Sequence, residues 1–132
     1  MAKISTKKFP SKNKMRELGF FNGHGIAEMT SLKLWIGFRP QDLGRGGHGA
    51  AYRVHRNGFN TYPKAAWYDY GSKTFNVFME SKEKTLQLAL DWADKKYGKR
   101  EWVRDPFGNY QDVTAWEAVM TRMKERVRRT SL

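Results

Sequence analysis

Residues 81–98 have the sequence SKEKTLQLALDWADKKYG and predict the clearest helix of the chain. Ser81 is a favourable N-cap because its hydroxyl can accept a hydrogen bond from a free backbone amide. Gly98 is a favourable stop because glycine tolerates the left-handed conformation that ends helices. Between them, apolar residues recur at helical spacing and form one stripe for burial. The stripe consists of Leu86, Ala89, Leu90, Ala93 and Tyr97.

Upstream of this helix, alternating apolar and polar residues predict half-buried antiparallel strands. Strands are expected at residues 32–38, 51–56, 65–70 and 74–79. In the second of these, Tyr52 and Val54 share one side, and Arg53 and His55 share the other. The glycine-dense stretch 44–49 is expected to be a flexible connector, because its backbone is too free for a regular element.

Downstream of the helix, a loop through residues 105–108 leads to a second predicted helix. Thr114 and Glu117 have the spacing of a capping box, in which the two residues satisfy each other's free backbone amides. The apolar stripe of this helix consists of Trp116, Val119, Met120, Met123 and Val127. Its flanks are basic and suit the negative end of the helix dipole.

Together these elements predict an α+β fold. We expect a three- to four-stranded antiparallel sheet packed on one helix, with an additional C-terminal basic amphipathic helix. Three parts follow along the chain: a basic flexible arm at residues 1–16, an α+β core domain at 17–98, and a loop with the C-terminal basic helix at 99–132.

The charge of the chain is its dominant feature. Lys and Arg number 25 against 13 Asp and Glu, which gives a formal net charge of +12 and a pI near 10.1. Self-repulsion on this scale costs stability, so an anionic partner is expected. DNA or RNA is the commonest such partner, because each phosphate that a cation neutralises releases counterions.

The candidate contacts to phosphate come from three regions of the chain. The arm contributes Lys7, Lys8, Lys12, Lys14 and Arg16. The glycine-rich stretch and the strands contribute Arg45, Arg53, His55, Arg56, Lys73 and Asn76. The C-terminal helix contributes Arg122, Lys124, Arg126, Arg128 and Arg129.

The sequence lacks the residues or the spacing that several kinds of functional site require. The chain has no cysteine, which removes disulfides, thiolate metal sites and thiol nucleophiles. Its three histidines are not spaced as a helical pair of metal ligands, and the glycines do not form a phosphate-binding motif. The longest apolar stretch, residues 34–38, is too short to span a bilayer. We therefore expect no cofactor, no metal and no catalytic residue, in a cytoplasmic protein.

Residues 52–98 resemble the three-stranded-sheet-plus-helix DNA-binding modules of the AP2 type and of phage integrase arm-binding domains. The resemblance is carried by Tyr52–Arg56 as first strand, residues 66–68 in the second, Phe75–Phe78 in the third, and the helix Lys82–Tyr97. It covers about a third of the chain and includes no diagnostic motif. It implies that the outer face of the sheet meets DNA, with Arg53, His55, Lys73 and Asn76 toward the partner.

The leading hypothesis is a nucleic-acid-binding protein without catalysis, which holds phosphates through its arm, sheet face and C-terminal helix. A second hypothesis is a small phage, mobile-element or ribosome-associated factor that docks on a nucleoprotein machine and regulates or inhibits it. A third is a small nuclease, which would need a convergent pocket of His, Arg and Tyr. The first hypothesis agrees with a location at the nucleoid or on ribosomes.

Overall fold

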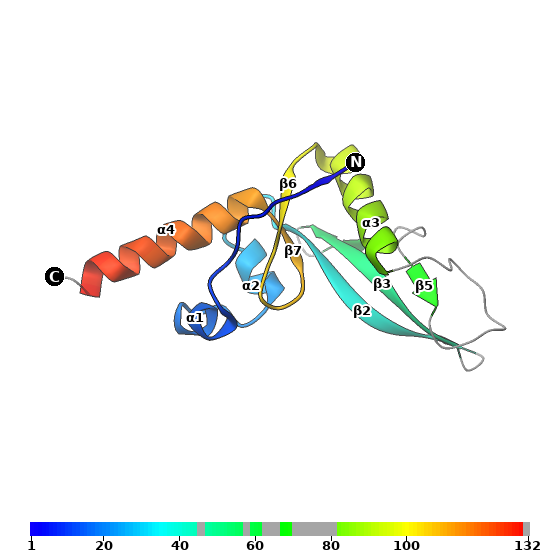
Figure 1. The fold of residues 1–132 in the computed structure, drawn as a ribbon, viewed down its shortest axis with the longest axis horizontal. Coiled ribbons are helices and arrows are strands. Elements are labelled where there is room, and N and C mark those ends of the chain that lie inside the picture. The colour runs from blue at the N-terminus through cyan, green and yellow to red at the C-terminus, as the bar shows by residue number, and fades with distance from the viewer. Residues whose placement is uncertain (45–46, 57–58, 62–66, 70–81, 131–132) are drawn as a thin grey trace.

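The computed structural model describes residues 1–44, 47–56, 59–61, 67–69 and 82–130. In these residues the chain has an α+β fold with one mixed sheet and four helices (Figure 1). None of the helices in those ranges is long and apolar enough to cross a membrane.

The described residues form a sheet of seven strands, and its long hairpin lies at the centre. The strands along the sheet are β1 (Lys3–Ile4), β6 (Glu101–Arg104), β7 (Tyr110–Asp112), β2 (Leu34–Gly44), β3 (Gly47–Arg56) and β4 (Phe59–Thr61), while β5 (Trp67–Asp69) also pairs with β3. All pairs are antiparallel except β1 with β6, which is parallel.

Helices cover the two faces of this sheet. On one face, helix α3 (Lys82–Tyr97) packs on Ile36 and Val54, which are paired across β2 and β3 and fully buried. Gln111 of β7 belongs to the opposite face, and its side-chain amide donates to the carbonyl of Gly23 at 2.9 Å. Gly23 begins helix α2 (Gly23–Ala27), which therefore lies on that second face.

A second cluster joins the remaining helices. Helices α1 (Lys12–Glu17) and α4 (Val113–Thr130) pack with α2. Their shared core consists of Met15, Leu18, Phe20, Ile26, Ala115 and Val119. The hairpin of β2 and β3 and the helix α4 extend in opposite directions from the body (Figure 1).

The sheet is larger than the predicted three or four strands. Strands β6 and β7 have only four and three residues, and β1 has two, so no periodic pattern marks them. The predicted strand 65–70 is present as β5, whereas the predicted strand 74–79 lies outside the described residues. The glycine-dense stretch is also not a separate connector, because β2 runs to Gly44 and β3 begins at Gly47.

The expectation of a free basic arm at residues 1–16 is corrected by the structure. β1 pairs with β6, and the backbone amide of Ala2 donates to the carboxylate of Asp91 in α3. Met15 of α1 is fully buried among apolar residues of α2 and α4. These are tertiary contacts, which the high lysine content of the segment does not reveal.

The two long helices occur where the sequence predicts them. Helix α3 ends before Gly98, whose φ of +101° is the left-handed conformation expected of a glycine stop. Helix α4 begins one residue before Thr114, so the capping residue differs from the prediction. Asp112 fills that role, because its Oδ1 accepts from the amide of Thr114 at 3.0 Å.

One buried ion pair connects the two long helices. Arg100 Nη1 donates to Asp112 Oδ2 at 2.6 Å, and both side chains are nearly inaccessible, with 10% and 4% of their surface exposed. The same guanidinium donates to the carbonyls of Tyr97 and Gly98 at the end of α3. The end of α3 is thus tied through Arg100 to the N-cap of α4.

We predict that Asp112→Ala lowers the free energy of unfolding by about 4 kcal/mol, because it leaves Arg100 buried without a counter-charge and removes the cap. Asp112→Asn keeps a good capping side chain and is expected to cost about 1 kcal/mol less. Urea unfolding measures both. The exposed Glu117→Gln on the same helix is the matched control, and equal stability of all three variants would contradict the role of the pair.

Candidate nucleic-acid interface

Helix α4 begins in the core and ends in solvent. Ala115 and Val119 are fully buried, whereas Val127 is 55% exposed although it continues the same apolar stripe. The helix has 18 residues and is about 27 Å long. Its second half therefore projects beyond the body, as the left side of Figure 1 shows.

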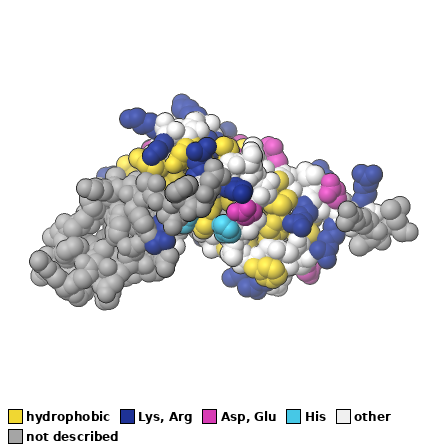
Figure 2. Space-filling model, turned by 180° about the vertical axis from the view of Figure 1, so that it is seen from behind, with side chains coloured by type: hydrophobic (Ala, Val, Ile, Leu, Met, Phe, Trp, Pro, Cys, Tyr) yellow, Lys and Arg dark blue, Asp and Glu magenta, His cyan; other side chains and the backbone are white. Residues whose placement is uncertain are grey.

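The exposed half of α4 carries most of its charge. Its exposed cations are Arg122, Lys124, Arg126 and Arg128. Glu125 is the one acid among residues 118–128. Arg129 also belongs to α4, and its side chain lies outside the part that the structure describes. Lysine and arginine side chains are visible at this end of the molecule, on the right of Figure 2.

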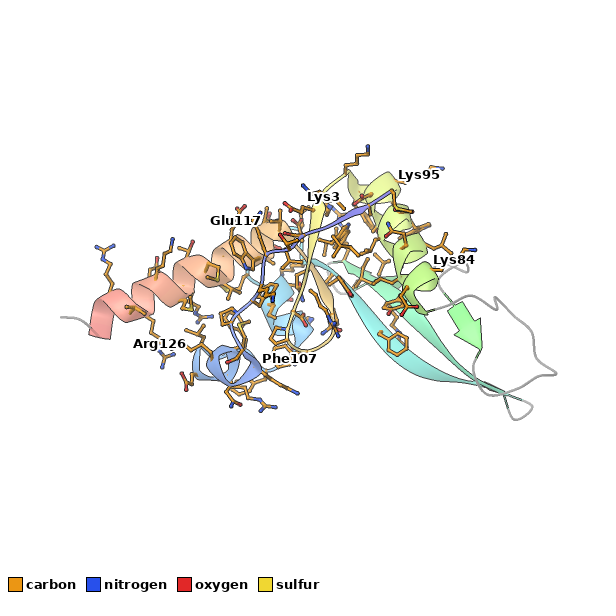
Figure 3. All side chains as sticks on the ribbon, in the orientation of Figure 1. Lys3, Lys84, Lys95, Phe107, Glu117 and Arg126 are labelled. Atoms are coloured by element: carbon orange, nitrogen blue, oxygen red, sulfur yellow. The ribbon has the colours of Figure 1, made fainter. Side chains whose placement is uncertain are left out.

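Helix α1 lies beside one flank of α4. Arg126 Nη1 donates to the carbonyl of Glu17, at the end of α1, at 2.5 Å. Figure 3 shows Arg126 extending from α4 toward α1. The guanidinium carbon of Arg122 lies 5.0 Å from the centre of the Phe20 ring, in the segment that follows α1. The end of α1, which carries the predicted cations Lys14 and Arg16, therefore lies beside the part of α4 that carries Arg122 and Arg126.

We call this surface the α1–α4 edge, consisting of Lys14, Arg16, Arg122 and Arg126. Arg16, Arg122 and Arg126 are exposed and Lys14 is half-buried. The acids beside them are Glu17, whose carboxylate pairs with Lys14 at 3.5 Å, and Glu125, which precedes Arg126 on α4. Lys124 and Arg128 lie on the opposite flank of α4, so this helix presents cations in two directions.

Lys7 and Lys8 lie away from the α1–α4 edge. The ammonium of Lys7 is 3.7 Å from the Glu101 carboxylate of β6, and 5.8 Å from the centre of the Trp116 ring. The carbonyl of Lys8 accepts a hydrogen bond from Trp116 Nε1 at 2.8 Å, while its side chain is exposed. The backbone of this segment is thus held on β6 and the start of α4.

The sheet residues are divided between the two faces. Arg53 and His55 lie opposite to Tyr52 and Val54, as predicted, and the His55 ring stacks on Trp35 at 4.0 Å. Both are half-buried. Arg56 is different, because it lies on the α3 face with its guanidinium 4.9 Å from the Tyr97 ring. It is therefore not part of the outer face.

The remaining predicted contacts of the sheet region are Arg45, Lys73 and Asn76, which lie outside the described residues. Within the part of the chain that the structure describes, the residues of the implied DNA-binding face are Arg53 and His55. In the structure, their strand β3 is an interior strand that pairs with β2, β4 and β5.

A groove that was not predicted from the sequence lies at the turn between β6 and β7. Two hollows of about 430 and 550 Å³ meet there, and Arg104 and Tyr110 line both of them. The first also has Phe38, Tyr52 and Phe107 in its walls, and the second is bounded by residues 4–11. We call the two together the Tyr110 groove.

The turn that shapes this groove is held by Asp105. Its Oδ1 accepts from the amides of Phe107 and Asn109 at 2.8 and 3.0 Å, and its Oδ2 accepts from Gln111 Nε2 at 2.9 Å. Asp105 is only 3% exposed. In the sequence, the turn residues DPFGN at 105–109, flanked by short alternating segments, indicate this hairpin.

Burial raises the pKa of the Tyr110 phenol above its ordinary value of 10.0. The guanidinium of Arg104 acts in the opposite direction, and the carboxylate of Asp105 raises the pKa further. Because burial is the largest of these effects, the phenol stays protonated and can donate a hydrogen bond at any physiological pH.

Within the described ranges, no group of three or more His, Asp and Glu residues is arranged to hold a metal ion. His24 instead forms an i,i+4 contact with Glu28 at 3.3 Å on the exposed surface. No family model, no curated protein and no solved structure matches this chain. The resemblance to AP2-type and integrase arm-binding modules therefore stays a prediction.

The raised pKa of Tyr110 predicts a pH dependence of stability. Above pH 10.0 the unfolded chain loses the phenol proton before the folded chain does, so stability falls as the pH rises from 10.0 through the folded pKa. Tyr110→Phe removes this titration, and we expect its free energy of unfolding to fall less steeply over that interval. Denaturant unfolding at a series of alkaline pH values measures the slopes, and identical slopes for the two proteins would contradict the prediction.

Proposed function

We propose that this protein binds nucleic acid without catalysing a reaction on it, and that the α1–α4 edge makes its main phosphate contacts. The observation that carries the proposal is the projecting half of α4, with exposed cations on both flanks beside those of α1. A formal net charge of +12 supports it, because a large positive charge favours association with a polyanion.

The geometry of the edge favours phosphates as its ligand. Arg122 and Arg126 are held in place by Phe20 and by the Glu17 carbonyl, so their guanidinium groups lose less side-chain entropy on binding. Guanidinium groups present several donors in a fixed plane that matches phosphate oxygens. A helix that extends about 13 Å beyond the core, at 1.5 Å per residue, can enter a groove of a duplex or a crevice of a folded RNA.

Arg53 and His55 are proposed as secondary contacts on the outer face of β3. Both side chains are half-buried, and the His55 ring stacks on Trp35. We therefore expect them to contribute less to the binding affinity than the exposed cations of α4. Lys8 and Lys12 add to the positive field between these regions, and such a protein would act in the cytoplasm, at the nucleoid or on ribosomes.

A second candidate function is docking on a nucleoprotein machine, as a phage, mobile-element or ribosome-associated factor. Two exposed apolar side chains favour it, Phe21 at 68% and Val127 at 55% exposure. A pull-down with and without nuclease treatment separates the two functions. A partner protein retained after digestion supports docking, whereas its loss supports direct nucleic-acid binding.

We predict that Arg122→Gln with Arg126→Gln weakens nucleic-acid binding and reduces its dependence on salt. Each phosphate contact contributes about 0.9 to the slope of log affinity against log salt, so losing two contacts reduces the slope by roughly 2. Titration of a labelled duplex and a structured RNA at several salt concentrations measures both quantities. Thermal unfolding verifies that the loss of the Glu17 and Phe20 contacts has not unfolded the protein.

A matched control variant removes two positive charges from a different surface, that of helix α3. Lys84 and Lys95 are exposed on α3 and extend away from α4 in Figure 3, so Lys84→Gln with Lys95→Gln should leave the slope close to that of the wild type. Lys124→Gln with Arg128→Gln tests the opposite flank of α4. Equal losses in the α3 and α4 variants would show that total charge, and not the α1–α4 edge, determines binding.

A further inference from the structure

The Tyr110 groove has the shape of a site for an extended ligand. Its two hollows have volumes in the range of small-ligand sites, about 430 and 550 Å³, and they lie on either side of Arg104 and Tyr110. These two residues are paired directly across β6 and β7, so one rigid hairpin carries the point where the hollows meet. A ligand that occupies both hollows must pass this pair.

The walls of the groove carry aromatic rings from separate elements. Phe38 and Tyr52 come from the central hairpin, Phe107 from the β6–β7 turn, and Tyr110 from β7. The rings of Phe38 and Tyr52 are 4.9 Å apart and tilted by 51°. Tyr52 is buried and supports the wall, whereas the half-buried Phe38, Phe107 and Tyr110 can stack on flat rings of a ligand, and every nucleobase offers such a face.

Cations accompany these rings along the groove. Arg104 is exposed at the meeting point, and Lys7 and Lys8 line the second hollow. The ammonium of Lys12 lies 5.9 Å from the centre of the Phe107 ring. Of the two acids in the lining, Asp105 is occupied by its three hydrogen bonds within the turn, and Glu83 at the start of α3 can accept from a base amino group.

We propose that the Tyr110 groove holds an unpaired stretch of a nucleic-acid strand, with a base against Tyr110 and neighbouring phosphates on Arg104 and on Lys7 or Lys8. Aromatic rings in the first hollow and lysines in the second, with Arg104 and Tyr110 in both linings, can contact the bases and the phosphates of a single strand. The proposal rests on the proposed function and deepens it, because it adds a site for unpaired nucleotides to the phosphate contacts of the α1–α4 edge.

Base-paired nucleic acid does not suit this groove. In a duplex the bases are stacked on one another, so none is available to enter a hollow unless it is first unstacked at a cost of a few kcal/mol. An unpaired strand has no such cost. The tyrosine phenol, which stays protonated, supplies a donor for a base oxygen or ring nitrogen next to the stacking surface.

The test compares a short labelled single strand with its duplex, using the full chain and four variants. Tyr110→Leu removes the ring and Arg104→Gln removes the exposed cation, and each is expected to weaken single-strand binding roughly tenfold while duplex affinity changes little. Tyr110→Phe keeps the ring and should retain most of the affinity. Lys99→Gln, which removes an exposed cation outside the groove, is the charge control.

Ultraviolet cross-linking gives a second readout that does not depend on folding of the variants. In the irradiated wild-type complex with the single strand, the cross-linked peptide is expected to contain Phe107 or Tyr110. A cross-link confined to α4, or an equal affinity of wild type and Tyr110→Leu for the single strand, would overturn the groove proposal while leaving the α1–α4 edge intact. Absence of binding to any nucleic acid at low salt would overturn both.

Discussion

The ion pair of Arg100 with Asp112 determines how the ends of this molecule are arranged. Arg100 binds the last carbonyls of α3, and Asp112 caps α4, so one buried contact of 2.6 Å joins the end of one long helix to the beginning of the other. A buried pair of this kind adds little net stability but is costly to break from one side. It holds the start of α4 at the end of α3, while Ala115 and Val119 pack this helix against α1 and α2.

The position of α4 explains why cations of α1 and α4 lie close together. Because α4 leaves the core beside α1, its Arg126 reaches the Glu17 carbonyl, and cations from opposite ends of the chain become neighbours. Neighbouring like charges repel each other, and the Lys14–Glu17 pair at 3.5 Å and the Glu17 carbonyl on Arg126 counter this repulsion. A bound anion would counter it further, so the folded arrangement is itself a reason to expect a phosphate ligand.

Segments with a regular apolar period could be predicted from the sequence. Very short strands, and contacts between distant parts of the chain, could not. Helix α3, the strand faces of Tyr52 and Val54, and the basic flank of α4 all follow from local spacing over six or more residues. Strands β1, β6 and β7 are too short to show a period, and Met15 is buried only because α2 and α4 are present. The cap at Asp112 was missed because Thr114 and Glu117 also satisfy a local rule, which the geometry of β7 overrides.

The N-terminal segment is the feature that relates the two proposed contact surfaces. Residues 4–11 form one wall of the Tyr110 groove, and the chain continues directly into α1, whose end contacts Arg126 of α4. A strand leaving the groove along this segment would lead toward the cations of the α1–α4 edge. The packing of this segment on β6 and α4 is therefore what would convert two separate basic regions into one continuous path for a polyanion.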